Sequence, residues 1–385
     1  MGERKSDKAA ALTLCTQCAK LHNMTTLMAQ LKLQPTPEQY DLLMQTLEEA
    51  NSACNWISQE AYREKVFRQF SLHKIVYRPT RERFNLSAQM VVRAIAKVSQ
   101  AYKISTKKQR GFKQHGAFPY DNRILSFKLD RREVSIWTLS GRERVPFLCS
   151  DRAFELLQGD RGEADLCFIR GEFFLFVACT VETPDPIDVD GALGVDLGLV
   201  NVATDSDGEQ YSGAHVVSIR ERRHRQRKRL QAKGTKSAKR VLRRLSGRET
   251  RFMTNVNHTI SKQLVQKAQC TGRALALEDL SGIRNRVKAR RTQRRRLHSW
   301  AFHQLGQFVQ YKAELAGVPV VFVNPAYTSQ TCSCCGHVSK SNRPSQDTFL
   351  CVECGFSAHA DANAAVNISV LGWAVRNSAV QLAPS

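Results

Sequence analysis

The chain has 385 residues, enough for two or three domains with sizeable buried cores. Its 58 Lys and Arg outnumber its 35 Asp and Glu, so the formal net charge is +23 and a polyanionic partner is favoured over an acidic protein. No signal peptide and no apolar run long enough to cross a bilayer is visible, which predicts a cytoplasmic rather than a secreted or membrane protein.

The chain opens with a polar stretch and then a strand and a helix. We interpret residues 1–23 as a flexible extension. Alternating apolar residues predict a strand at 25–33. Thr36, Pro37 and Gln39 then provide an N-cap, a first-turn proline and a capping-box glutamine, which together predict the start of a helix.

The first half of the chain predicts a small β-barrel with helices inserted into it. Apolar residues at helical spacing predict a helical bundle over 36–105. Short segments of alternating apolar residues follow within 106–185 and predict antiparallel strands. With the residues at 24–35 these strands could close a barrel, after which Pro184–Pro186 marks a linker.

The pattern of residues 190–385 predicts a further unit that contains both strands and helices. Two of its apolar strands end in an acid: Asp196 follows the strand that begins at Gly191, and the segment 274–280 ends in Glu278 and a second carboxylate. An acid buried in an apolar strand is costly unless it meets a cation, hydrogen-bond donors or a metal.

Two segments of this half concentrate positive charge. Residues 220–251 carry 15 Lys and Arg against two Glu and predict two helices broken at Gly234, whereas residues 284–296 carry eight Lys and Arg and no acid. A solvated charged face is the alternative, but like charges at this density favour contact with phosphates. The residues that we expect to bind nucleic acid are Arg222, Arg225, Lys228, Arg229, Arg240, Arg243, Arg290, Arg291, Arg294 and Arg295.

Four cysteines predict a zinc ribbon at 328–358. Cys332 and Cys335 form one C-x2-C pair, and Cys351 and Cys354 form a second at ribbon spacing. Four thiolates suit one tetrahedral Zn²⁺ and leave no ligand position for water, so the expected role of the metal is structural.

A third acid follows the ribbon. Asp361 precedes an Ala-rich helical segment, so taken alone it is equally well explained as a helix N-cap. In an RNase H-like sheet, however, Asp196, Glu278 and Asp361 would converge. Three converging carboxylates can hold two Mg²⁺ ions, which predicts a metal-dependent nuclease or transposase.

Several segments resemble one known family. The stretches GVDLGLVNVATDSDG, LALEDLSGIRNR, NPAYTSQTCSCCG, FLCVECGFSAHADANAAVNI and LKLQPTPEQYDLLMQTLEEANSACNWIS look like the TnpB proteins of bacterial insertion sequences, relatives of compact type V CRISPR effectors. The resemblance extends over about residues 25–370. It implies an α+β, multidomain RNA-guided DNA endonuclease in the bacterial cytoplasm, with a barrel-like wedge domain, a helical recognition domain and a RuvC domain that carries the zinc ribbon.

The resemblance also implies site residues and partners. Asp196, Glu278 and Asp361 would bind the two catalytic Mg²⁺ ions, and the family pattern selects Glu278 over Asp279. A guide RNA would read double-stranded target DNA beside a short flanking motif. A monomer is favoured, although the sequence leaves the oligomeric state open. The alternatives are a RuvC-like transposase or resolvase that works without RNA, and a nuclease-inactive zinc-ribbon repressor that binds DNA.

Overall fold

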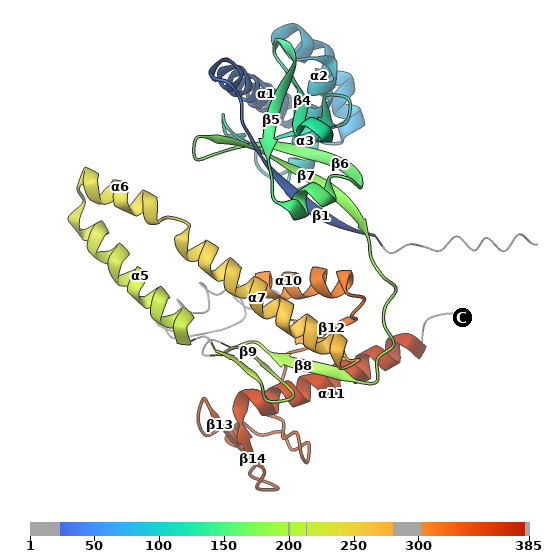
Figure 1. Cartoon of the computed structure of the whole chain (residues 1–385), viewed down its shortest axis with the longest axis vertical. Coiled ribbons are helices and arrows are strands. Elements are labelled where there is room, and N and C mark those ends of the chain that lie inside the picture. The colour runs from blue at the N-terminus through green and yellow to red at the C-terminus, as the bar shows by residue number, and fades with distance from the viewer. Residues whose placement is uncertain (1–23, 199–200, 213, 280–301, 382–385) are drawn as a thin grey trace, which may run out of the picture. The chain divides into compact units, whose positions relative to one another are not determined.

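The computed structural model describes residues 24–198, 201–212, 214–279 and 302–381. The chain divides into two compact units, residues 24–182 and a second unit that begins at Thr183 (Figure 1). Each unit has its own sheet and its own hydrophobic core. The fold is therefore mixed α and β with more than one domain, as the sequence predicts.

The first unit is built on a seven-stranded antiparallel sheet in the order β2-β6-β7-β1-β5-β4-β3. Its strands are β1 (Met24–Leu33), β2 (Phe118–Tyr120), β3 (Leu125–Lys128), β4 (Glu133–Thr138), β5 (Gly141–Leu148), β6 (Asp160–Ile169) and β7 (Glu172–Glu182). The ends of the sheet approach each other, since the Tyr120 hydroxyl in β2 donates to the Trp137 carbonyl in β4 at 3.1 Å. The sheet is thus nearly closed and barrel-like. The short strand β2 and the helix α4 (Asp151–Leu156) lay outside the sequence prediction.

Three helices lie between β1 and β2 in the chain. They are α1 (Pro37–Glu64), α2 (Gln69–Arg83) and α3 (Ala88–Ile104). The predicted capping box is present, because the Thr36 hydroxyl accepts from the Gln39 N–H while the Gln39 side chain accepts from the Thr36 N–H, both at 3.3 Å. Satisfying these two backbone donors fixes the first turn of α1.

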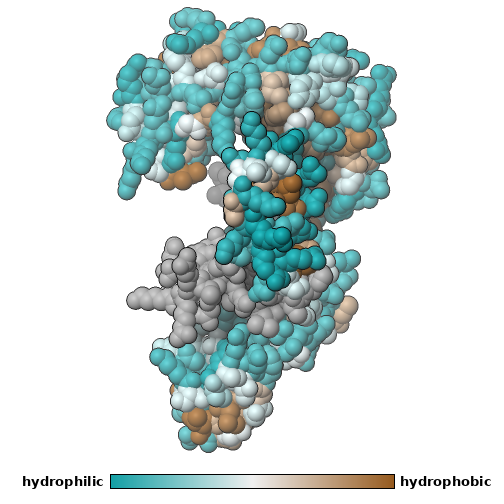
Figure 2. Space-filling view, turned by 90° about the vertical axis from the view of Figure 1, so that its left-hand side faces the viewer, coloured by the Kyte–Doolittle hydropathy of each residue, from teal (hydrophilic) through white to brown (hydrophobic). Residues whose placement is uncertain are grey.

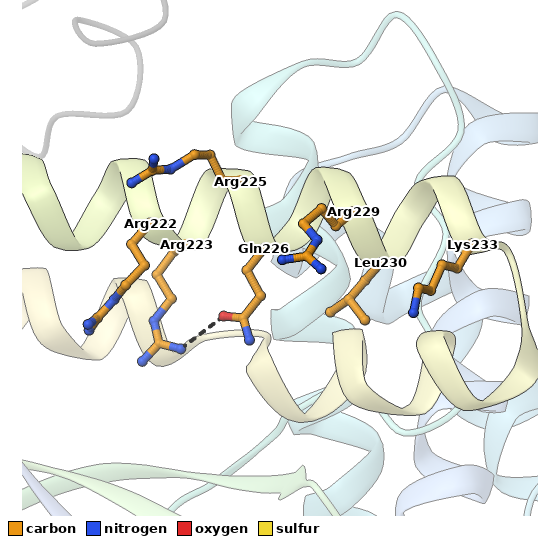
Figure 3. A pocket seen from close by; sticks show the side chains of 7 residues that line it. All are labelled: Arg222, Arg223, Arg225, Gln226, Arg229, Leu230 and Lys233. Atoms are coloured by element: carbon orange, nitrogen blue, oxygen red, sulfur yellow. Dashed lines mark hydrogen bonds between the residues drawn. The ribbon is translucent and has the colours of Figure 1, made fainter.

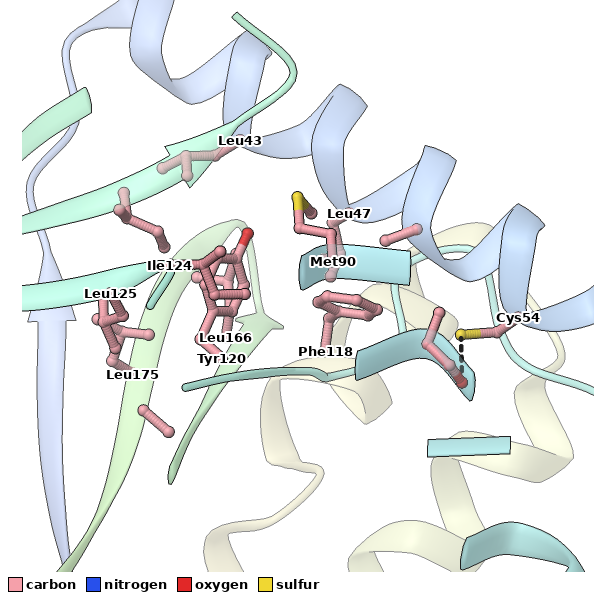
Figure 4. Packing of buried hydrophobic residues seen from close by; sticks show 14 of the residues in the cluster. Leu43, Leu47, Cys54, Met90, Phe118, Tyr120, Ile124, Leu125, Leu166 and Leu175 are labelled. Atoms are coloured by element: carbon pink, nitrogen blue, oxygen red, sulfur yellow. Dashed lines mark hydrogen bonds between the residues drawn. The ribbon is translucent and has the colours of Figure 1, made fainter. Parts of the chain in front are cut away.

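The three helices and the sheet share one continuous core. Leu43 and Leu47 of α1 and Met90 of α3 pack with Phe118 and Tyr120 of β2, and none of the five is more than 1% exposed (Figure 4). Burying one such side chain contributes about 1.5–3 kcal/mol. The helices and the barrel of this unit therefore stabilise each other.

The second unit is built on a five-stranded mixed sheet in the order β10-β9-β8-β11-β12. Its strands are β8 (Ala192–Asp196), β9 (Asn201–Asp205), β10 (Gln210–Ser212), β11 (Ala274–Glu278) and β12 (Val320–Val323). Neighbours β8, β9 and β10 are antiparallel, whereas β8, β11 and β12 run parallel. The helices of the unit are α5 (Ala214–Lys233), α6 (Lys236–Leu245), α7 (Arg248–Cys270), α10 (Phe302–Leu315) and α11 (Ala360–Gln381).

The basic segment differs in one respect from its prediction. The expected break lies at Gly234, which has a φ of +64° and separates α5 from α6. A third helix, α7, begins at Arg248 and continues well past the segment. Its buried residues recur at helical spacing, a signal that the sequence prediction left out: Met253, Asn257, Ile260, Leu264 and Ala268.

Alternate residues of β8 and β11 face different helices. Leu193, Val195, Leu275 and Leu277 pack in the cluster that contains residues of α7 and α10. The opposite face carries Ala192, Ala274 and Ala276, which pack against α11 (Figure 1). These small residues allow a close approach, since a Cβ at Gly194 would collide with the Ala365 carbonyl and one at Gly372 with the Ala276 side chain. Helix α11 therefore lies directly against the backbone of β8 and β11.

Candidate active site and metal centre

Asp196 and Glu278 lie side by side at the ends of two neighbouring strands. β8 and β11 run parallel with Val195 opposite Leu277, so the next residue of each strand is the acid. Because side chains alternate along a strand, both acids belong to the face that α11 covers. Two carboxylates thus lie at the carboxyl edge of the sheet, on one face.

Asp361 lies in the first turn of α11. Its Oδ1 accepts from Arg343 Nη2 at 3.3 Å, and its backbone N–H donates to His359 Nδ1 at 3.3 Å. A Cβ built on Gly198, two residues past Asp196, would lie 3.8 Å from Asp361 Oδ2. The third acid is thus next to the segment that follows the first.

The three acids interact electrostatically. Burial raises the pKa of Asp196 to about 8, and the negative charges of Glu278 and Asp361 add to the shift. Arg343 acts in the opposite direction. Burial also raises the pKa of Glu278, although the Thr328 hydroxyl donates to Glu278 Oε1 and opposes the shift. A cation bound among these carboxylates would stabilise their ionised forms, so the raised pKa values are consistent with a metal site.

The structure places the three acids in one region, but their carboxylate oxygens do not all lie within 4.8 Å of one another. Among the residues described, the four cysteines are the one set of three or more potential metal ligands whose donor atoms all lie within 4.8 Å of one another. The carboxylates of Glu278 and Asp361 instead accept from Thr328 and Arg343.

The cysteines form a compact sulfur cluster. Cys332 Sγ lies 3.7 Å from Cys354 Sγ, and Cys335 Sγ lies 3.6 Å from Cys351 Sγ. A tetrahedron of sulfurs about 2.3 Å from a Zn²⁺ ion has edges of about 3.8 Å, so the spacing fits this metal. Backbone N–H donors also lower the pKa of the Cys351 thiol to about 6, which favours its thiolate.

Two turns of the same form present these sulfurs. In each, the glycine after the second cysteine has a positive φ, 76° at Gly336 and 72° at Gly355, and its N–H donates to the first cysteine's carbonyl. Buried Asn342 connects the turns by donating to the His337 carbonyl and accepting from the Val352 N–H. Strands β13 (Thr348–Leu350) and β14 (Ser357–His359) complete the ribbon.

Two asparagines of α11 connect this ribbon to the helix that begins with Asp361. Asn363 accepts from the Ser333 N–H at 3.0 Å and donates to the Thr331 carbonyl at 2.8 Å. Asn367 donates to the carbonyls of Thr328 and Thr331. The two asparagine side chains, which are at most 8% exposed, therefore link the position of the sulfur cluster to the position of the third acid.

Four residues of this site were missing from the sequence prediction. They are Thr328, Arg343, Asn363 and Asn367. The two asparagines had a detectable signal, since they are four residues apart in a helical segment whose intervening residues are all apolar. Thr328 and Arg343 lie in loops whose sequence gives no indication of contact with residues 50 and 18 positions away.

Six of the ten expected nucleic-acid residues lie on an exposed hairpin of α5 and α6. Figure 2 shows hydrophilic side chains dominating the part of this hairpin nearest the viewer. Along α5, Arg222, Arg225, Arg229 and Lys233 line a groove of about 670 Å³ with Arg223, Gln226 and Leu230 (Figure 3). Lys228, Arg240 and Arg243 are exposed on the same two helices. Arg290, Arg291, Arg294 and Arg295 fall outside the described residues.

No helix in the described ranges is both long and apolar enough to span a bilayer.

Comparison with known proteins finds two family matches in the second half of the chain. Residues 176–284 match the OrfB_IS605 family, described as a probable transposase. Residues 302–368 match the Cas12f1-like TNB domain. The first range contains Asp196 and Glu278, and the second contains the four cysteines and Asp361.

Individual relatives cover the same region. The CRISPR-associated endodeoxyribonuclease Cas12f1 of Sulfoacidibacillus thermotolerans is 40% identical over 120 residues, which are 31% of this chain and 27% of the relative. A TnpB-like protein of Methanocaldococcus jannaschii is 36% identical over 131 residues, or 34% and 46% of the two chains. The chain spans between about a quarter and half of the length of these relatives.

A solved structure resembles the whole fold. The Cas12f1 chain in a complex with sgRNA and target DNA aligns with a TM-score of 0.61 over 86% of this chain and 83% of that chain. Because the two are 15% identical, the likeness concerns the fold alone.

Proposed function

We propose that this chain, which belongs with the TnpB-like and Cas12f proteins, is an RNA-guided, metal-dependent DNA endonuclease of a transposable element. It would cleave DNA beside a short flanking motif. Base pairing by a bound RNA would supply the sequence specificity, and the protein would read the duplex motif.

One observation carries the proposal. Two half-buried acids end adjacent parallel strands on the face covered by α11, and the first turn of α11 supplies a third. The strand order β10-β9-β8-β11-β12 contains two antiparallel pairs followed by two parallel pairs, which supports an RNase H-like, RuvC-type domain over residues 190–385.

Asp196, Glu278 and Asp361 would hold two Mg²⁺ ions. Their donor set of carboxylate oxygens is the one that this ion prefers. Burial raises the pKa of Asp196 and of Glu278, so a bound cation would stabilise their ionised forms. When bound, a pair of such ions activates water and stabilises the leaving oxygen of a phosphodiester. Thr328 would orient Glu278 by hydrogen bonding, and Arg343 would balance charge at Asp361.

One Zn²⁺ in the four-cysteine cluster would have a structural role. All four ligand positions are taken by sulfur, which leaves none for a reacting water. Through Asn363 and Asn367 the ribbon would hold the start of α11, and with it Asp361, against the sheet.

The partners would be a guide RNA and double-stranded target DNA. The cationic groove of α5 supports phosphate binding, because each neutralised phosphate releases condensed counterions. In the first unit, we assign the barrel at 24–35 and 106–185 as a wedge domain and the helices at 36–105 as a recognition domain. The shared fold with a Cas12f1 chain supports this assignment.

The OrfB_IS605 match supports a second candidate, a transposase or resolvase that uses the same acids without RNA. A repressor that binds DNA without cutting it is less well supported, because all three acids are retained.

The test uses the full chain purified without added nuclease, together with Asp196→Ala, Glu278→Ala and Asp361→Ala. We expect a discrete RNA to co-purify, and cleavage of matched DNA to require both this RNA and Mg²⁺. Each alanine variant should lose at least about a hundredfold in cleavage rate while keeping its nucleic-acid affinity. If RNA-free protein cuts the same DNA at the same site, the transposase candidate replaces the guided one.

A further inference from the structure

A second hollow lies within the helices of the second unit, next to the groove in Figure 3, with which it shares Arg223. Its volume is about 640 Å³, within the range of ligand pockets. Helices α5, α6 and α7 form its walls, and α10 contributes one residue. The lining residues are Arg223, Arg227, Gln231, Leu242, Leu245, Ser246, Gly247, Glu249, Thr250, Met253 and Gln304.

One side of the cavity is apolar. Leu242 and Leu245 of α6 line it while still partly accessible, and Met253 of α7 is 5% exposed. Leucine side chains normally pack against protein, so two leucines beside an open cavity offer contact area for an apolar or aromatic group. A methionine adapts readily to a flat ring, since its side chain is flexible and its sulfur is polarisable.

The other side is cationic. Arg223 and Arg227 both project from α5, and α5 also carries the cations of the neighbouring groove (Figure 3). Glu249 is the one carboxylate among the lining residues, and it pairs with Arg227 at 2.7 Å. Arg223 donates to the neutral Gln226 side chain at 3.3 Å and pairs with no carboxylate in the described part of the chain, so its charge is available to an anion.

The helix α7 begins at the rim of the same cavity. Its N-cap is Gly247, which has no side chain to accept from the first-turn N–H groups. The positive end of the helix dipole adds to the attraction for an anion, and Glu249 in the first turn offsets part of it. At the side of α10, Gln304 accepts from Asn257 at 3.0 Å and bonds with Thr254, so its amide is fixed in place.

We propose that this cavity receives a single unstacked nucleotide of the nucleic-acid strand that α5 holds. The base lies against Leu242, Leu245 and Met253, and its phosphate meets Arg223 and the start of α7. An apolar wall opposite guanidinium groups matches a nucleotide, which combines a flat ring with an anion. The inference rests on the proposed nucleic-acid partner, and it adds a site for one extruded base.

The test compares three 12-base-pair RNA duplexes: one without a bulge, one with a single bulged uridine, and one with an abasic residue at the bulge. Deoxyribose versions of the three determine whether RNA or DNA supplies the nucleotide. Dissociation constants are measured for the full wild-type chain, for Leu245→Trp, which fills the cavity, and for Leu230→Trp, a matched control in the groove of Figure 3.

The wild type should bind the uridine bulge about tenfold more tightly than the abasic bulge in at least one of the two series. This ratio should fall to about one in Leu245→Trp and persist in Leu230→Trp. A third variant, Arg223→Gln, should weaken binding of both bulged duplexes more than that of the unbulged duplex.

Equal wild-type affinity for the uridine and abasic bulges in both series overturns the inference and leaves the proposed nuclease intact. A ratio that survives in Leu245→Trp, or an Arg223→Gln effect that is the same for bulged and unbulged duplexes, also overturns it. Failure of the wild type to bind any of the duplexes contradicts the proposed function itself.

Discussion

Asp196 is the residue at which burial and charge conflict most clearly. Its carboxyl loses most of its hydration at the end of β8, and the negative charges of Glu278 and Asp361 disfavour its ionised form. The folded protein without metal therefore retains the Asp196 proton between about pH 4 and pH 8, whereas the unfolded chain has lost it. The state that binds more protons over this interval is the folded one, so its stability falls as the pH rises.

The fall in stability with rising pH gives a prediction for Asp196→Asn. Asparagine mimics the protonated acid, so the metal-free variant should be more stable than wild type at pH 8, by up to about 5 kcal/mol. It should also lose part of the pH slope between about 4 and 8, while Glu278, whose pKa is raised too, keeps the rest. Thermal unfolding in the presence of a chelator measures both effects. Asp207→Asn is the control of opposite sign, because the Arg273 hydrogen bond lowers the pKa of Asp207 to about 2. A wild-type stability that rises between pH 4 and pH 8 contradicts the assignment.

Thr328 acts on the second acid through one hydrogen bond. Thr328→Val removes the hydroxyl and keeps the shape, so the pKa of Glu278 should rise further and cleavage near pH 7 should fall about tenfold. Because a higher pH ionises Glu278 again, the loss should shrink as the pH increases. Thr328→Ser keeps the donor and should retain most of the activity. An equal loss at every pH would show that Thr328 affects cleavage by another route.

At the scale of elements, the ribbon and α11 act as one structural part. Cys354→Ser should abolish the zinc that elemental analysis finds, expected at about one per chain, and should loosen the start of α11. Asn363→Ala separates the two effects, since it removes the bonds to Ser333 and Thr331 but leaves the sulfurs.

We expect Asn363→Ala to keep its zinc and yet to show faster amide exchange at residues 328–333 and slower cleavage. Asn342→Ala, which removes contacts inside the ribbon, serves as the comparison and should loosen the two cysteine turns instead. Normal exchange and normal cleavage in Asn363→Ala would mean that the ribbon does not position Asp361.

Sequence patterns predicted the secondary-structure elements better than they predicted the contacts between distant residues. The end of β8 in Asp196 and the C-x2-C turns depend on local chemistry, so they could be recognised from neighbouring residues. Arg343 pairs with Asp361 only because the ribbon folds back over the start of α11, and no local pattern encodes that approach. The start of α7 was also missed, because its first turns continue the basic composition of α6.

At the scale of the whole molecule, the chain consists of two units with separate cores. The core of the first unit joins helices α1 to α3 to the barrel, and that of the second unit joins the five-stranded sheet to α7 and α10. All of the proposed metal ligands lie in the second unit. Metal binding should therefore stabilise one unit and not the other.

Calorimetry of the full chain tests this division. We expect two unfolding transitions, because each unit buries its own apolar surface. A zinc chelator should lower the midpoint of one transition, and added Mg²⁺ should raise the midpoint of that same transition by mass action, more at pH 8 than at pH 6, because binding releases the Asp196 proton. The other transition should not move. Asp196→Ala should remove the response to Mg²⁺ while leaving the response to the zinc chelator. If both transitions moved together with either metal, the two units would be coupled in folding, and the first unit could not be treated as a separate nucleic-acid module.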